Sequence, residues 1–131
     1  MEGVRCASRP NRKGHSEWFM GEVSIEPIVD AKAPGRTSSA LVNFKPGART
    51  AWHTHPLGQT LYVTHGKGWV QIWGGPITEI NLGDVIWFPP NEKHWHGATV
   101  TTALSHIAIH EALDGKSVGW LEQVSEDQYR A

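Results

Sequence analysis

Hydrophobic and polar positions change over short distances along this chain, and no long segment follows the 3.6-residue period of a helix. The apolar runs are rich in Val, Ile, Thr, Trp and Phe, and turns containing Gly or Pro separate them, a pattern typical of a β-sandwich or barrel. It predicts eight strands: Glu22–Val29, Ser38–Phe44, Thr60–Thr64, Gly68–Trp73, Ile77–Ile80, Asp84–Phe88, His94–Ala98 and Leu104–His110. The turns between them are expected at 33–35, 45–47, 65–68, 74–76 and 89–91. The fold class predicted is therefore all-β.

The C-terminal residues depart from this pattern. Ser125 is followed three positions later by Gln128, which is the spacing of a helix capping box, so we predict a short helix over Ser125–Arg130. The chain has 131 residues, the size of one domain, and we expect a single domain over residues 1–131. It has one cysteine, Cys6, so the domain holds no intrachain disulfide and needs a hydrophobic core instead.

Charge and hydropathy limit the partners that this chain can bind. The chain has 12 Lys and Arg and 13 Asp and Glu, whereas a domain that neutralises many phosphates has an excess of basic residues. No apolar run approaches the roughly 20 residues of a membrane helix, and residues 1–11 lack the apolar stretch of a signal peptide. We expect a cytoplasmic protein with a small-molecule substrate, and neither nucleic acid nor a membrane as its partner.

Histidines provide the first indication of chemistry. Five of the eight fall at residues 53–65 and 94–96, as the pairs His53-x-His55 and His94-x-His96 and the turn residue His65. Side chains two positions apart point to the same face of a strand, so each pair can direct two imidazoles at one point. Three imidazoles with the Gln59 carboxamide would leave coordination positions free on a metal, as catalysis needs. The alternative is that these pairs are ordinary polar residues on strand surfaces. We expect His65, in a turn, and His15, in the N-terminal part without a pattern, to be exposed.

A third strand could add to this site. In Leu104–His110, His106, Ala108 and His110 share one face, and Ser105, Ile107 and Ile109 share the other. One face of a barrel strand lines the lumen, and we expect the His106 and His110 face to do so, although alternation alone does not decide between the two. Ala40 and Val42 share a face with Phe44 on another strand and could form the wall of a pocket or simply part of the core.

Two motifs then resemble those of the cupin superfamily. Gly47, His53, His55, Gln59 and Gly66 match the intervals of G-x5-H-x-H-x3–4-E-x6-G, over residues 47–66. Gly83, Pro89, Asn91, His94 and Ala98 follow G-x5-P-x-G-x2-H-x3-N, over residues 83–98. The resemblance implies a single-domain jelly-roll barrel, the double-stranded β-helix, with His53, His55, Gln59 and His94 as metal ligands. Gln59 replaces the usual Glu, which removes one negative charge from the ligands.

Longer strings resemble a narrower family, the small bacterial cupin hydroxynitrile lyases. These strings are Thr50–Thr60, Glu92–Gly97, Leu113–Lys116 and Glu126-x-Gln128-Tyr129. The resemblance implies manganese and reversible cleavage of (R)-mandelonitrile-type cyanohydrins to an aldehyde and hydrogen cyanide, in a homodimer or homotetramer. We expect His106 first and His96 second to transfer protons, Thr50 to donate a hydroxyl hydrogen bond, and Ala40, Val42 and His110 to line the substrate pocket.

The residues leave other functions open. The same ligands would accept Fe, Co, Ni, Cu or Zn as well as Mn, because none of them is a thiolate. An iron or copper dioxygenase acting on a small aromatic or alkene substrate is therefore one alternative, and it would consume oxygen. A cupin that binds a small ligand without turnover is another, although it would have no need for clustered proton carriers.

Overall fold

The computed structural model describes residues 1–130. Within that range the chain forms strands with the following bounds: β1 (Arg12–Lys13), β2 (Phe19–Met20), β3 (Val23–Val29), β4 (Thr37–Phe44), β5 (Arg49–Thr50), β6 (His53–Thr54), β7 (Gln59–Ile72), β8 (Thr78–Asn81), β9 (Val85–Phe88), β10 (His94–Ala98), β11 (Leu104–Glu111) and β12 (Gly119–Trp120). A 3₁₀ turn, η1 (Cys6–Ser8), precedes them, and one α-helix, α1 (Glu126–Tyr129), follows them. The predicted all-β class is confirmed.

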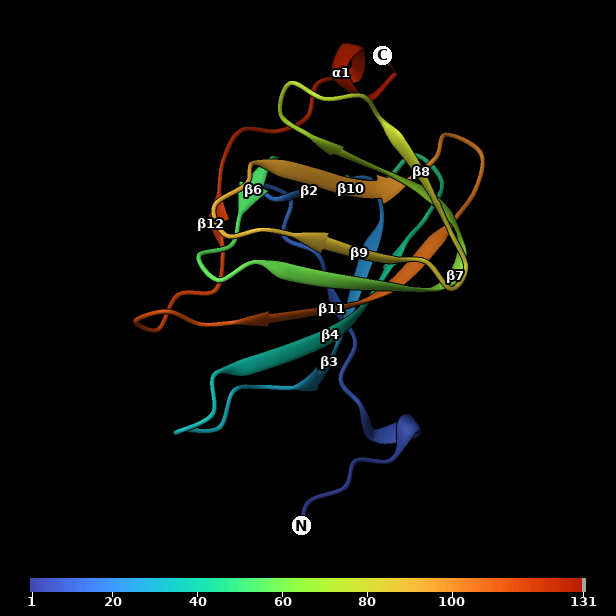
Figure 1. Ribbon diagram of the computed structural model, residues 1–131. Coiled ribbons are helices and arrows are strands. Elements are labelled where there is room, and N and C mark those ends of the chain that lie inside the picture. The colour runs from blue at the N-terminus through green and yellow to red at the C-terminus, as the bar shows by residue number, and fades with distance from the viewer. Residues whose placement is uncertain (131) are drawn as a thin grey trace.

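The strands curl into a barrel with two walls (Figure 1). Hydrogen bonding runs in the order β1-β3-β4-β11-β7-β10-β5-β2, with β8 and β9 also on β7, and β6 between β10 and β12. These strand pairs are all antiparallel. The long strand β7 joins the walls, because its first half pairs with β11 and its second half with β10.

One sequence prediction was wrong at this point. The turn expected at 65–68 would have separated two strands, but β7 passes through it without reversing. Gly66 takes a φ of 79°, and the register with β11 shifts between Ser105 and His106, so the strand bends locally instead. Gly68 comes so close to β10 that an added Cβ would lie 2.3 Å from the Gly97 carbonyl oxygen. Glycine here permits a bend and a close backbone approach rather than a hairpin.

The buried residues show which face of each strand points inward. Val42 and Phe44 of β4 and Leu104 and Ala108 of β11 are buried in one hydrophobic cluster, together with Leu61 of β7. Ile109, on the opposite face of β11, is 38% exposed. Since His106 shares the face of Ala108, the histidine face of β11 is the one inside the barrel, as expected.

The terminal segments close the other wall. The β2 strand pairs with β5, and Phe19 and Met20 pack against the two core clusters. At the other end, the Ser125 and Gln128 capping box is present, and α1 follows it as predicted. Tyr129 of α1 is buried and donates its hydroxyl to the Ala98 carbonyl over 2.7 Å. The C-terminal helix therefore anchors the chain end on β10.

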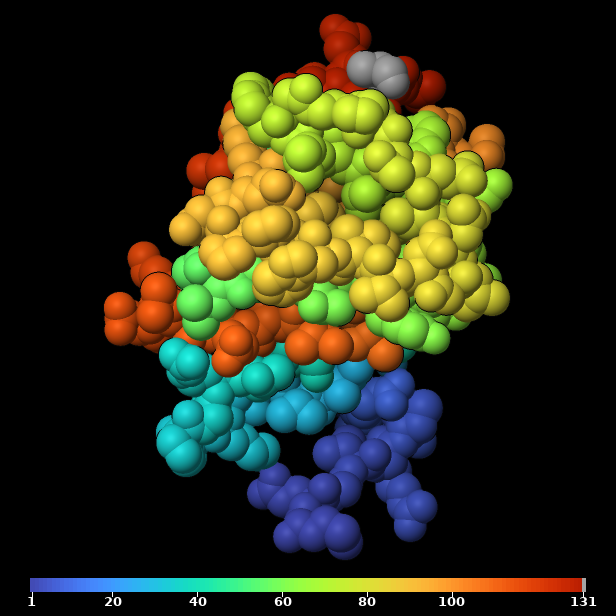
Figure 2. Space-filling model, in the orientation of Figure 1, coloured from blue at the N-terminus to red at the C-terminus, as the bar shows by residue number. Residues whose placement is uncertain are grey.

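The other expected strands agree with the structure to within a residue or two, but β1, β2, β5, β6 and β12, each two residues long, were missed. They are too short to show periodicity. None of the described residues form a helix that is long and apolar enough to span a membrane. Residues 1–9 extend away from the barrel, at the end of the molecule opposite α1 (Figures 1 and 2).

Candidate metal centre and neighbouring histidines

Pairing between β6 and β10 brings the two histidine pairs together. His53 and His94 are register partners in this ladder, and their ring centroids lie 4.3 Å apart. His55 follows β6 directly, with its ring centroid 5.1 Å from that of His53. Gln59 begins β7, and its Oε1 lies 3.4 Å from Nε2 of His94. All four side chains are buried, so they face one another away from solvent.

Backbone carbonyls fix three of these imidazole rings. Nδ1 of His53 lies 2.8 Å from the Ala51 oxygen, and Nδ1 of His94 lies 2.8 Å from the Glu92 oxygen. Nδ1 of His55 lies 2.6 Å from the Ser117 oxygen. A carbonyl only accepts, so each Nδ1 must carry the proton and each Nε2 keeps its lone pair, as in metal-bound histidine.

The unpartnered nitrogens fit a divalent metal. Nε2 of His55 and Nε2 of His96 are buried without a hydrogen-bond partner among the described residues. A buried polar atom of this kind is costly unless something satisfies it. One ring nitrogen from each of His53, His94 and His96 also lies within 4.8 Å of the others. The barrel therefore holds a three-histidine site suited to a divalent metal, with a fourth histidine, His55, beside it.

Burial keeps these imidazoles neutral. Desolvation lowers the pKa of His55 to about 4 and that of His94 to about 3. It also lowers the pKa of His53 and of His96 well below the usual value, and the neighbouring histidines add to the effect. Neutral imidazole is the form that binds a metal, so the site is ready for one at neutral pH.

A second histidine pair lies next to this centre. His106 on β11 reaches across the barrel to His96 on β10, with Nε2 of His106 2.9 Å from Nδ1 of His96. Phe44 packs against both rings, and burial lowers the pKa of His106 to about 4. The buried Thr50 hydroxyl accepts a hydrogen bond from the His96 amide over 3.2 Å. Two imidazole rings and a hydroxyl are thus buried next to one another.

The residues expected in the substrate pocket lie beside these two groups of histidines. Val42 is the register partner of His106, and Ala40 is that of Ala108, on the inward face of β4. His110 stacks on His55 with ring centroids 5.1 Å apart, and its Nδ1 lies 3.5 Å from Nε2 of Gln59. A pocket of about 200 Å³ reaches His110 from outside, between Leu57 and Trp87.

Comparison with known proteins agrees with this geometry. The family model for the cupin domain matches residues 40–110, which contain both histidine motifs. This chain belongs to the cupin family. The cupin is 57% identical over 130 residues to a protein of Granulicella tundricola named (R)-mandelonitrile lyase, with 99% of each chain covered.

Solved structures support the same fold. A cupin-like protein of Thermotoga maritima is 44% identical, covers 90% of each chain and has a TM-score of 0.86. The polyketide cyclase RemF of Streptomyces resistomycificus has a TM-score of 0.76 over 99% of this cupin and 91% of its own chain. Its identity is only 17%, so this second likeness concerns the fold alone.

Sequence reasoning missed two contacts of the cupin's metal centre. The Ser117 carbonyl orients His55, and Trp120 of β12 is the register partner of His53, with ring centroids 4.8 Å apart. A carbonyl belongs to every residue, so sequence does not reveal that one of them is a hydrogen-bond acceptor in a site. Trp120 lies 67 positions from His53 in a strand too short to show a pattern.

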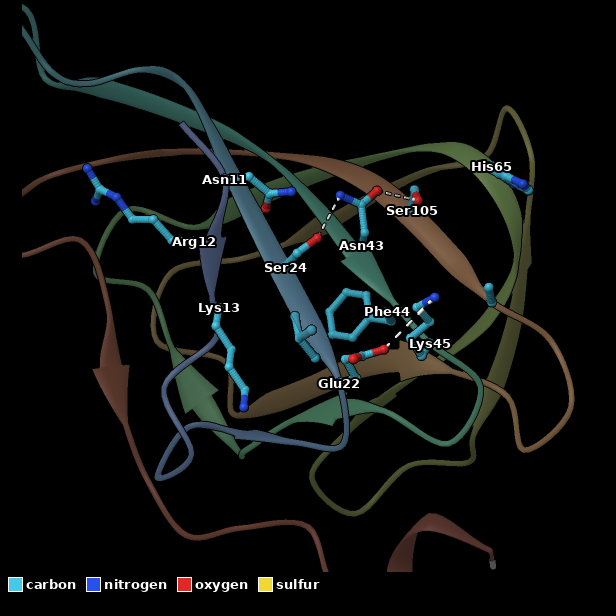
Figure 3. Close-up of a pocket in the computed structure, with 12 residues that line it drawn as sticks. Asn11, Arg12, Lys13, Glu22, Ser24, Asn43, Phe44, Lys45, His65 and Ser105 are labelled. Atoms are coloured by element: carbon cyan, nitrogen blue, oxygen red, sulfur yellow. Dashed lines mark hydrogen bonds and ion pairs between the residues drawn. The ribbon is translucent and has the colours of Figure 1, made fainter. Parts of the chain in front are cut away.

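A larger hollow of this cupin lies elsewhere (Figure 3). It is a groove of about 640 Å³ lined mainly by residues of β1, β3, β4 and β11. Asn43 crosses it, donating to Ser24 over 3.2 Å and accepting from Ser105 over 2.7 Å. Its lining contains none of the predicted metal, catalytic or pocket residues, and His65 is on its rim, exposed as expected, as is His15. We assign the groove no part in the chemistry.

The buried histidines make the metal-free cupin sensitive to acid. Their pKa values lie below the 6.5 expected in an unfolded chain, so between about pH 6.5 and 4 the unfolded state binds protons that the folded state does not. We expect the free energy of unfolding to fall as the pH falls through this window. Above it, the contribution of these histidines to the free energy of unfolding should be constant. Urea unfolding of chelator-treated protein at pH 7.5, 5.5 and 4.5 measures this. A free energy of unfolding that stays constant would contradict it.

Proposed function

We propose that this cupin is a metal-dependent hydroxynitrile lyase that reversibly cleaves (R)-mandelonitrile-type cyanohydrins to an aldehyde and hydrogen cyanide. The observation that carries the proposal is 57% identity over nearly the whole chain to a protein named (R)-mandelonitrile lyase. The site is consistent with that reaction, because a histidine metal centre lies beside a second pair of neutral histidines in a buried compartment.

For the metal we assign His53, His55, Gln59 and His94 as ligands. His55 is preferred to His96 because its Nδ1 is fixed by a carbonyl, as in the other two histidines, whereas His96 uses Nδ1 to contact His106. We propose manganese, which accepts mixed nitrogen and oxygen donors; Fe, Co, Ni, Cu and Zn would also fit them. When bound, the metal would supply a Lewis acid for negative charge, which the neutral Gln59 does not offset.

His106 is assigned the proton transfer. In cleavage the hydroxyl proton passes to a neutral imidazole, the bond between the carbinol carbon and the nitrile carbon breaks, and cyanide leaves with the bonding pair. The aldehyde carbonyl forms, and cyanide takes up the proton to give hydrogen cyanide. With its pKa lowered to about 4, His106 is neutral at pH 7 and free to accept the proton, which His96 can share over 2.9 Å.

Thr50 and the β4 side chains would position the substrate. The Thr50 oxygen accepts from the His96 amide, so its own proton is available to the substrate oxygen or to cyanide. Ala40 and Val42 are small residues that pair with Ala108 and His106, so we assign them to the wall beside the aromatic ring of the substrate. His110, next to His55 and Gln59, would line the side of the pocket toward the surface.

The test is cleavage of racemic mandelonitrile by the purified protein, with metal content measured on the same sample and a chelator-treated control. We expect chelator-sensitive, enantioselective release of benzaldehyde. Metal-loaded protein without cleavage above background would reject the lyase function. Oxygen uptake would then be measured, since a dioxygenase consumes oxygen and the lyase does not.

We also propose that the protein acts in the cytoplasm as a homodimer or homotetramer. Assembly is supported by three exposed apolar side chains on the outer face of β7 and β9: Tyr62, its register partner Val85, and Trp87. Exposed apolar groups that lie together commonly mark a protein interface. Light scattering coupled to size-exclusion chromatography would give the mass, and a monomer would reject this part of the proposal.

A further inference from the structure

A segment that is distant in sequence from both histidine motifs lies against the metal centre. After β11 the chain runs along the side of the barrel, past β6, to α1 (Figure 1). We name residues 117–122 the C-terminal strap. Its strand β12 adds to β6. Directly after β12, the Leu121 amide donates to the Trp52 carbonyl and the Trp52 amide donates to the Glu122 carbonyl, each over 2.9 Å. The strap is thus hydrogen-bonded to the segment that carries His53 and His55.

Two contacts of the strap reach the histidines themselves. The Ser117 carbonyl accepts from Nδ1 of His55 over 2.6 Å. The ring centroid of Trp120 lies 4.8 Å from that of His53, and Trp18 stacks on Trp120 with centroids 5.3 Å apart and an interplanar angle of 4°. An added Cβ at Gly119 would come within 3.0 Å of the Thr54 hydroxyl, so glycine permits the close approach.

We propose that Trp120 is a positioning residue for the metal centre, holding His53 in its ligating orientation, and that the C-terminal strap as a whole orients both ligands of the first histidine motif. His53 is almost completely buried, and Trp120 supplies one of the surfaces that cover its ring. With the indole removed, the imidazole can rotate and water can reach its hydrogen bond with Ala51. Removing the indole should therefore weaken metal binding as well as core packing. The inference rests on the metal site proposed above.

The experiment compares the parent protein with Trp120→Ala, Trp120→Phe and Trp69→Ala. Trp69 is the matched control, because it is also half-buried but packs against Tyr129, with ring centroids 5.2 Å apart. Each full-length protein is treated with chelator and titrated with Mn²⁺ to give Kd. A Co²⁺ titration follows, because its visible absorption reports ligand geometry independently of activity. Urea unfolding records the stability of each variant.

For Trp120→Ala we expect Kd for Mn²⁺ to rise by about 10-fold or more, the usual effect of losing a group that orients a ligand, with an altered Co²⁺ spectrum. Trp120→Phe should recover most of the affinity. Trp69→Ala should lose stability but keep the parent Kd and spectrum. Parent-like Mn²⁺ binding by Trp120→Ala, or equal weakening in Trp69→Ala, would overturn the inference. A parent protein that binds neither ion would reject the metal site itself, and this inference with it.

Discussion

Replacing His94 with alanine is expected to abolish metal binding and lyase activity together. His94 lies at the centre of the site, 4.3 Å from the His53 ring and 3.4 Å from the Gln59 oxygen, with its own Nδ1 fixed by Glu92. Phe88 stacks on it at 3.7 Å, which prevents the ring from turning away. Losing an orienting group already costs about 10- to 100-fold in metal affinity, so loss of a ligand should cost more than about 100-fold.

Metal content and benzaldehyde release measured on the same sample check this result. His65→Ala is the matched control, because His65 is exposed and distant from the site, and it should keep both properties. Urea unfolding shows whether the variant is still folded at the assay temperature. A folded His94→Ala protein with a full complement of metal and normal turnover would remove His94 from the ligand set.

Replacing His106 should separate chemistry from metal binding. His106 is fully buried on β11 and contacts His96 rather than the four assigned ligands, so His106→Ala should keep its metal. General acid–base catalysis contributes about 10²- to 10⁴-fold, and kcat should fall within that range. His106→Gln fills more of the space but cannot transfer a proton at neutral pH, so its kcat should be similarly low.

Steady-state kinetics and metal analysis of the two His106 variants provide the test. Low turnover with normal metal content, in both, is the expected result. If His106→Gln turns over at the parent rate, His106 serves packing alone and another group transfers the proton. If either variant loses its metal, His106 belongs with the ligands and the assignment of His96 and His106 must be revised.

Sequence predicted which side chains gather in this site better than it predicted the backbone atoms that orient them. The i, i+2 spacing predicted that His94 and His96 share one face of β10, because the alternation of side chains follows from strand geometry alone. The inward face of β11 could not be chosen from alternation, since one face offers isoleucines and the other histidines. Packing against β4 determines which face points inward. Val42 and Phe44 of β4 are buried, and Val42 is the register partner of His106, so the histidine face of β11 is on the same, inner side.

What sequence could not predict depends on tertiary pairing. The glycines at 65–68 looked like a hairpin, but β7 continues because β11 and β10 hydrogen-bond to its two halves. The C-terminal strap pairs with β6 from a distant part of the chain. Its strand has only two residues, which is too short to show periodicity in the sequence. A local pattern therefore predicts which histidines share a strand face, but not which backbone atoms hold them in place.

The carbonyl acceptors of the three histidines that we assign as ligands leave freedom to engineer this barrel. Ala51, Glu92 and Ser117 contribute main-chain oxygen, not side-chain atoms, to the imidazoles. The buried Ala51 is constrained by its packing, but Glu92 and Ser117 are only partly buried. Their side chains can be redesigned to reshape the outside of the site while the geometry of the ligands is preserved, because any residue that keeps the local backbone presents the same oxygen.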